Sequence, residues 1–193
     1  MSSELGRTSA KPSWLRDAER LDVALYAAVA ATPTPALDRG VRRLTAAADY
    51  SRVSMAAAAG LALTRGSRGR RAAFMGLASV AVTSTVVNVA LKPLTRRRRP
   101  DRETRGVPSI RHVPMPASRS FPSGHTASAF AFATAVGHVL PSEAVVLRAL
   151  AAAVGYSRIH AGVHWPGDVL LGGLVGTSTA QLTVYAVERR ATS

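Results

Sequence analysis

The sequence predicts an all-α, integral-membrane fold, a bundle of about five to six helices with an amphipathic helix at its N-terminal end. Two uncharged apolar runs, residues 72–91 and 169–187, come close to the roughly 20 residues that a helix needs to cross a bilayer. Neither run has the polar stripe of a surface helix. Shorter apolar runs at 21–31, 53–64, 126–140 and 144–156 supply the other helices. A soluble, alanine-rich helical bundle is the alternative, because alanine is only weakly hydrophobic.

The chain divides into an N-terminal polar, interfacial segment, residues 1–20, and a single membrane domain, residues 21–190. Residues 12–31 are expected to form the amphipathic helix, with Trp14 and Tyr26 as anchors at the membrane interface. The prolines of "TPTP", residues 32–35, end it. Acidic residues such as Glu4 and Asp17 stand where a signal peptide should be basic, so we expect the helix to be retained rather than cleaved.

The remaining elements follow from breaks in the apolar pattern. A stretch at 37–64 turns apolar after Arg52, and residues 65–71 read as a short basic turn before the long run at 72–91. Residues 92–122 are rich in arginine and proline, and a loop of that length is typical of a functional segment. If the helices alternate in direction, this loop and the broken stretch 157–168 emerge on the same face of the bundle.

The composition indicates an anionic partner and excludes cysteine chemistry. The chain has 25 Lys+Arg against 11 Asp+Glu, a formal net charge of +14. Such a balance favours nucleic acid, anionic lipid or a phosphorylated substrate. The absence of cysteine excludes disulfides and thiolate metal sites.

Two loops carry the residues suited to phosphate chemistry. Ser123 and Gly124 stand just before a predicted helix, where unpaired backbone N–H groups attract anions. Arg99 and Arg158 can bind phosphate oxygens through two nitrogens each, and Lys92 adds a point charge. An ordinary serine cap and a solvated arginine run are the structural alternatives for these residues.

Histidines and a carboxylate complete the candidate site. His164 and Asp168 fit an imidazole nucleophile or base that is oriented by a carboxylate, which leaves the other ring nitrogen free to attack. His125 is a second imidazole, suited to supplying a proton near neutral pH. A structural role is the alternative for each histidine taken alone.

Three motifs together carry a resemblance to a known family. They are "KPLTRRRRP" (Lys92-x6-Arg99-Pro100), "PSGH" (residues 122–125) and "SRIHAGVHWPGD" (residues 157–168). In this order they resemble the three-part signature of the type 2 phosphatidic acid phosphatase superfamily, in its membrane lipid phosphatase branch. The signature covers residues 92–168, and the helical pattern extends the likeness over most of the chain.

The resemblance implies a role for each matched residue. His164 would attack phosphorus and form a phosphohistidine, Asp168 would align its ring, and His125 would protonate the departing oxygen. The phosphoryl oxygens would be held by the remaining matched residues, Lys92, Arg99, Ser123, Gly124 and Arg158. Phosphoryl transfer depends mainly on such positioning and charge stabilisation. We therefore expect neither a metal ion nor a cofactor.

The expected substrate is a lipid phosphate at a membrane face. Candidates are a polyprenyl diphosphate such as undecaprenyl diphosphate, phosphatidic acid, phosphatidylglycerol phosphate, or a polyprenyl-phosphoryl sugar phosphate. The chain would be a multi-pass protein of the cell membrane that binds no nucleic acid. Its oligomeric state stays open. The basic residues balance between the two faces, so the positive-inside rule gives no orientation. The resemblance favours an active site on the extracytoplasmic face.

Three rival interpretations remain at this point. His160, His164 and Asp168 could be metal ligands at four-residue spacing, although the broken backbone and the crowd of cations argue against this. The arginine run could belong to a non-enzymatic protein that binds anionic lipid or nucleic acid. A soluble member of the same superfamily, an acid phosphatase or a vanadium haloperoxidase, is the third.

Overall fold

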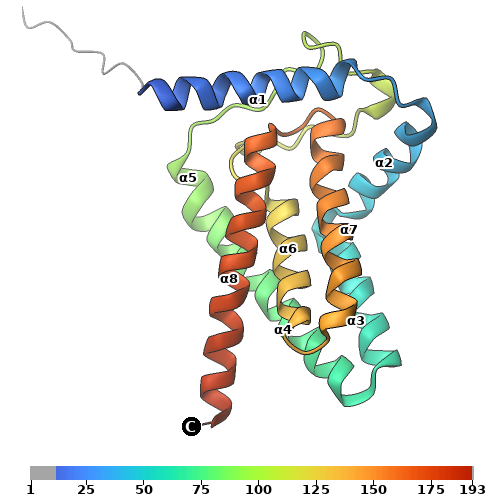
Figure 1. Ribbon diagram of the computed structural model, residues 1–193, viewed down its shortest axis with the longest axis vertical. Coiled ribbons are helices and arrows are strands. Elements are labelled where there is room, and N and C mark those ends of the chain that lie inside the picture. Colours follow the sequence, from blue (N-terminus) through green and yellow to red (C-terminus); the bar gives the residue numbers. More distant parts are fainter. Residues whose placement is uncertain (1–11, 193) are drawn as a thin grey trace, which may run out of the picture.

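The computed structural model describes residues 12–192, and these form helices joined by loops, with no strand. The helices are α1 (Ser13–Ala31), α2 (Pro35–Ala47), α3 (Arg52–Thr64), α4 (Gly66–Thr85), α5 (Lys92–Leu94), α6 (Gly124–Gly137), α7 (Pro141–His160) and α8 (Pro166–Thr192). A π-helical segment, Val86–Leu91, joins α4 to α5 without a break. Helices α3, α4, α6, α7 and α8 run side by side, while α1 lies across one end of the bundle (Figure 1). The predicted all-α bundle with an N-terminal helix is confirmed.

Helix α6 forms the centre of the bundle, packed against α4, α7 and α8. Its alanines, among them Ala127, Ala131 and Ala135, are fully buried. Small side chains let the neighbouring backbones approach closely. At Gly176 of α8, an added Cβ would lie 2.0 Å from the carbonyl oxygen of Ala127. Glycine at this position therefore lets α8 pack directly against the backbone of α6.

Two helical segments are long and apolar enough to cross a membrane, Gly66–Leu94 and Pro166–Arg190. Both also present large apolar side chains on the outside of the bundle. The exposed ones include Phe74, Leu77, Val82, Val89, Leu170, Leu174, Leu182 and Tyr185. Such a surface is unfavourable in water and favourable against acyl chains. The pattern supports a protein that sits in a bilayer.

Helix α1 matches the predicted amphipathic helix, but one of its two predicted anchors was wrong. Trp14 is 69% exposed, as an interface anchor would be. Tyr26 is instead buried and packs on Trp165 with the ring centroids 5.1 Å apart. The helix runs without a break through residue 20, where the sequence suggested a boundary, and residues 1–11 of the predicted polar segment lie outside the described residues.

Two other boundaries differ from the sequence-based prediction. The basic residues at 65–71 do not form a turn, because α4 already begins at Gly66, which has a positive φ of 58°. The stretch at 37–64 is divided into α2 and α3 by a short turn, Asp49–Ser51. In that turn Tyr50 and Ser51 both adopt left-handed backbone conformations.

Candidate active site

The two predicted loops meet at the end of the bundle that α1 covers. The long loop after α5 and the short connection between α7 and α8 lie there beside the first turn of α6 (Figure 1). Gly162 turns the chain after α7 with φ of 73°, a left-handed conformation that favours glycine. The eight residues predicted from the sequence are linked there by the contacts that follow.

His164 is held between a carboxylate and a guanidinium. Its Nδ1 lies 3.4 Å from Oδ2 of Asp168, and its Nε2 lies 3.0 Å from Nη1 of Arg99. A guanidinium can only donate, so Nε2 accepts and Nδ1 carries the proton. In this tautomer Nε2 carries the lone pair and is the reactive atom, which is the arrangement that a nucleophilic histidine requires.

Burial keeps the His164 ring neutral. The side chain is 2% exposed, and desolvation lowers the pKa of His164 to about 4. The hydrogen bond to Asp168 opposes this shift, while the positive charge of Arg99 adds to it. A neutral imidazole is nucleophilic and an imidazolium is not, so the ring is competent throughout the neutral pH range.

Asp168 is fixed by partners from the long loop after α5 and from the short connection before α8. Its Oδ1 accepts from Nη1 of Arg97 at 2.9 Å. Its Oδ2 accepts from the hydroxyl of Ser120 and, at 3.0 Å, from the backbone N–H of Trp165. The carboxylate is fully buried, so these partners compensate for the loss of water. They also set the direction in which it faces His164.

Ser118 connects the two cations of the first motif. Its hydroxyl accepts from Nζ of Lys92 at 3.2 Å and from Nη2 of Arg99 at 3.3 Å. The Lys92 ammonium also donates to Asn88 one helical turn earlier. Burial lowers the pKa of Arg99, which nevertheless stays a cation at neutral pH. Two desolvated cations held side by side form a strong site for an anion.

Arg158 reaches both histidines from the last turn of α7. Its side chain is 2% exposed, and Nη1 donates to Oγ1 of Thr45 at 2.8 Å. Its positive charge acts on the rings of His125 and His164 alike. The buried Nε has no hydrogen-bond partner among the described residues. An unsatisfied buried donor of this kind is suited to an oxygen of the substrate.

The two small residues at the start of α6 play different parts. Ser123 is fully buried, and its N–H is already used by the carbonyl oxygen of Asp168 at 2.9 Å. Gly124 faces the site, since a Cβ placed there would lie 3.8 Å from Nζ of Lys92. The N–H groups of the first turn of α6 have no partner within the helix and carry partial positive charge. The backbone N–H groups that remain available to an anion at this point are therefore those of Gly124 and His125 and not that of Ser123.

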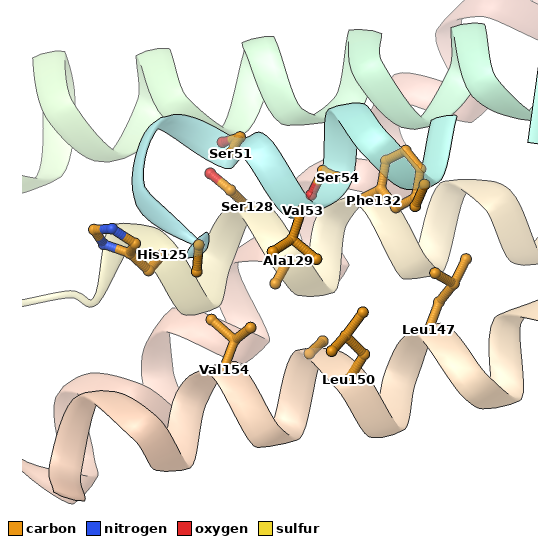
Figure 2. A pocket seen from close by; sticks show the side chains of 13 residues that line it. Ser51, Val53, Ser54, His125, Ser128, Ala129, Phe132, Leu147, Leu150 and Val154 are labelled. Atoms are coloured by element: carbon orange, nitrogen blue, oxygen red, sulfur yellow. The ribbon is translucent and has the colours of Figure 1, made fainter. Parts of the chain in front are cut away.

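His125, in the first turn of α6, faces the turn between α2 and α3. Its Nε2 lies 2.7 Å from Oδ1 of Asp49, in the turn between α2 and α3. The ring lines one end of a largely apolar pocket between α3, α6 and α7 (Figure 2). It also borders a second, more polar pocket, which Lys92 and Asn88 line.

His160 belongs to a separate polar cluster and not to this site. Its Nε2 lies 3.1 Å from Oδ1 of Asp38 and 3.1 Å from Oγ1 of Thr34. Fully buried Arg111 donates to the same Asp38 oxygen at 2.9 Å. Among residues 12–192, no three histidine or carboxylate side chains converge as metal ligands. The rival metal triplet of His160, His164 and Asp168 is therefore not assembled.

Several residues of the site were not found from the sequence. They are Thr45, Asp49, Asn88, Arg97, Ser118 and Ser120. For Asp49 the composition offered one signal. The chain has 11 acidic residues against 25 basic ones, so each carboxylate is a candidate partner for a buried cation. The hydroxyl and amide partners lie inside loops and turns without a local pattern, so no spacing rule would identify them.

Part of the sequence is similar to that of a known phosphatase. Decaprenylphosphoryl-5-phosphoribose phosphatase of Mycobacterium tuberculosis (strain ATCC 25618 / H37Rv) is 33% identical over 115 residues, which are 58% of this chain and 60% of that protein. The match thus spans less than two thirds of that relative's length.

Two solved structures share the fold. Aquifex aeolicus LpxE superposes with a TM-score of 0.68 and 26% identity, over 86% of this chain and 95% of LpxE. A transmembrane PAP2-type phosphatidylglycerolphosphate phosphatase from Bacillus subtilis gives a TM-score of 0.66 and 24% identity, over 90% of this chain and 87% of that one. Together with the two apolar spans, these folds identify a membrane protein.

The family assignment rests on the stretch that contains the site. The model of the PAP2 superfamily matches residues 73–192, which run from α4 to the end of α8 and include all eight predicted site residues. Because this match covers more than half of the sequence, the chain belongs to the PAP2 superfamily.

Proposed function

We propose that this protein is a membrane-embedded lipid phosphatase that works through a phosphohistidine on His164. One observation carries the proposal: Nδ1 of His164 is held by Asp168, while Nε2 points at Arg99. An anion drawn to Arg99, Lys92 and Arg158 would therefore meet the nucleophilic nitrogen. The substrate would be a phosphomonoester or diphosphate of a polyprenyl or glycerolipid, such as undecaprenyl diphosphate or phosphatidic acid.

The reaction proceeds by two displacements at phosphorus. In the first, the lone pair of His164 Nε2 attacks, the bond from phosphorus to the lipid oxygen breaks, and His125 protonates that oxygen. In the second, water attacks the phosphohistidine, His125 takes the proton of the water, and phosphate leaves. Lys92, Arg99, Arg158 and the N-terminus of α6 stabilise the negative oxygens during both steps. These cations supply the charge stabilisation that a metal would otherwise provide, so we expect activity without metal or cofactor.

The surroundings of the site support a lipid substrate. The apolar pocket beside His125 is lined by Val53, Phe132, Leu147 and Leu150 and suits a hydrocarbon chain next to the phosphate (Figure 2). The two candidate spans would make the protein multi-pass, with residues 21–190 as its membrane domain. We place the active site on the extracytoplasmic face.

A second candidate is a phosphatase of a polyprenyl-phosphoryl sugar phosphate. It is favoured by the mycobacterial relative, whose name gives decaprenylphosphoryl-5-phosphoribose as its substrate. The chemistry at phosphorus would be the same, because both substrates present a terminal phosphate near a membrane surface. A non-enzymatic protein that binds anionic lipid would need the cations but not the His164–Asp168 pair.

The proposal is tested by measuring phosphate release from a panel of lipid phosphates in detergent. The panel contains phosphatidic acid, undecaprenyl diphosphate, phosphatidylglycerol phosphate and a polyprenyl-phosphoryl pentose phosphate, each with EDTA present. We expect release from at least one of them, inhibition by vanadate, and no release by His164→Ala. If the wild type and His164→Ala release equal amounts from every member, the protein is not this phosphatase.

A further inference from the structure

A second carboxylate–imidazole pair lies at the site, outside the three motifs. Nε2 of His125 lies 2.7 Å from Oδ1 of Asp49. The same oxygen lies 3.8 Å from Nη1 of Arg158. Asp49 comes from the turn between α2 and α3, 76 residues from His125 in the chain. The contact is therefore made by the tertiary fold and not by local geometry.

The backbone that presents Asp49 is unusual. The two residues after it, Tyr50 and Ser51, have φ of 55° and 56°. A left-handed conformation costs a residue other than glycine about 1–2 kcal/mol, and such strain clusters at functional sites. Tyr50 is 82% exposed, so burial of its side chain does not account for the turn. The conformation does place the Asp49 carboxylate against His125.

The pair resembles Asp168 and His164 but differs in the ring nitrogen that the carboxylate faces and in the exposure of the carboxylate. In both, a carboxylate faces one ring nitrogen, which is Nε2 in His125 and Nδ1 in His164. Nδ1 of His125 has no hydrogen-bond partner among the described residues. The Asp49 side chain is 42% exposed, whereas that of Asp168 is fully buried. Asp49 therefore connects the ring to bulk water, which suits a histidine that must gain and lose a proton in each cycle.

The charges around His125 explain why it needs an anionic partner. The ring faces Arg158 from α7, Lys92 from α5, and Asp49 from the α2–α3 turn. His125 lies outside both candidate spans, and burial, followed by Arg158, lowers its pKa to about 4. Asp49 opposes this shift, and the negative charge of a bound phosphate would oppose it further, so the imidazolium is favoured once substrate is bound. Of these three groups Asp49 is the anion, and an anion beside an imidazole favours its charged form.

We propose that Asp49 is a positioning residue that acts through His125, holding the ring by Nε2–H and stabilising its charged form so that Nδ1–H protonates the leaving oxygen. This inference rests on the proposed phosphatase function. As the bond from phosphorus to the lipid oxygen breaks, its electron pair goes to that oxygen together with the Nδ1 proton. Water later gives a proton to Nδ1 as its oxygen attacks phosphorus, and the pair of the P–N bond returns to His164. The imidazolium opposite Asp49 is thereby restored.

Matched leaving groups separate this role from a structural one. Farnesyl monophosphate expels an alkoxide, which needs a proton, whereas farnesyl diphosphate expels a phosphate monoester, whose second pKa of about 6 makes it stable without one. We expect Asp49→Asn to lower kcat on the monophosphate about 10- to 100-fold, since a general acid contributes about 10²–10⁴-fold in all. On the diphosphate the loss should be less than about threefold, with KM little changed on either substrate.

Four companion variants complete the test. His125→Ala should show the same selectivity, and Asp49→Asn added to His125→Ala should cause no further loss on the monophosphate. Asp49→Glu should restore part of the rate. Asp17→Asn removes an exposed carboxylate of α1 and should match the wild type on both substrates. The alkaline limb of the monophosphate rate profile should move to lower pH in Asp49→Asn, because the imidazolium has lost its counter-charge.

The outcomes distinguish this inference from the proposed function. Equal losses on the two farnesyl substrates, or a wild-type rate for Asp49→Asn on the monophosphate, would overturn the role of Asp49 and leave the phosphatase function standing. A wild-type protein that releases phosphate from neither substrate, nor from any member of the lipid panel, would overturn both.

Discussion

Arg97 donates from Nη1 to Oδ1 of Asp168 at 2.9 Å, across 71 residues of sequence. The same guanidinium pairs through Nη2 with Asp22 of α1. Asp22 in turn accepts from the backbone N–H of Gly167 at 2.6 Å, at the start of α8. One arginine of the long loop thus joins the N-terminal helix to the carboxylate that holds His164. The orientation of His164 therefore depends on how α1 docks across the bundle.

Removing Arg97 should weaken both the fold and the reaction. Breaking a buried ion pair costs about 3–5 kcal/mol, and the 30% exposure of Arg97 reduces our expectation to about 1–3 kcal/mol. We expect Arg97→Ala to lower the unfolding temperature in detergent and to reduce kcat/KM. Arg96→Ala, an exposed neighbour in the same run, is the control and should leave both unchanged. Identical melting curves for the two variants would contradict the role given to Arg97.

Asp168→Asn should slow the chemical step while leaving substrate binding nearly intact. The amide can present its oxygen or its nitrogen to Nδ1, so the tautomer of His164 is no longer enforced, and the corresponding change in another carboxylate–histidine pair lowers kcat about 10⁴-fold. We expect a loss of about 10³- to 10⁴-fold in kcat with KM within a fewfold of the wild type. Steady-state kinetics on the best lipid of the panel measures both constants. A rise in KM at constant kcat would instead assign Asp168 to binding.

The stability of the protein should fall between neutral and acidic pH because of His164. Its pKa is about 4 in the folded protein and about 6.5 when unfolded, so the unfolded chain binds the proton first. The contribution is therefore fully present above pH 6.5 and is lost as the pH falls to about 4, at most about 3 kcal/mol.

Comparison of two proteins isolates this contribution from that of other groups. Unfolding temperatures of the wild type and of His164→Gln are measured in detergent at pH 7 and at pH 4.5. The difference between the two pH values should be smaller for the variant, which carries no titratable group at this position. Equal differences would show that the His164 ring is not kept neutral by burial.

Gly176→Ala should destabilise the contact between α6 and α8. The new Cβ would lie 2.0 Å from the carbonyl oxygen of Ala127, so the helices must move apart. Overpacking of this kind costs about 1–3 kcal/mol. Gly60→Ala is the matched control, because nothing lies within 4 Å of its added Cβ and alanine favours a helix by about 0.5–1 kcal/mol. Thermal unfolding should therefore shift down for the first variant and not for the second.

Local sequence patterns were sufficient for the helical class and for the main residues of the site. The uncharged runs at 72–91 and 169–187 predicted the two long helices, since the length and polarity of a segment depend on its own residues. Closeness along the chain also predicted closeness in space for Lys92 and Arg99 and for His164 and Asp168, because each pair lies within one short segment. The alternation of helix direction then explains why the loops meet on one face.

Only the tertiary structure decided which residues support that chemistry. Asp49, Arg97 and Asp22 join the site from segments 71 to 76 residues away from their partners, and nothing in their local sequence marks them. The same holds for Tyr26, which the pattern assigned to the membrane interface and the fold buries on Trp165. Periodicity and capping depend on neighbours along the chain, whereas a buried charge must find its counter-charge in space. The candidate catalytic residues could thus be identified from the sequence, whereas the partners that hold them are determined by the packing of the helices.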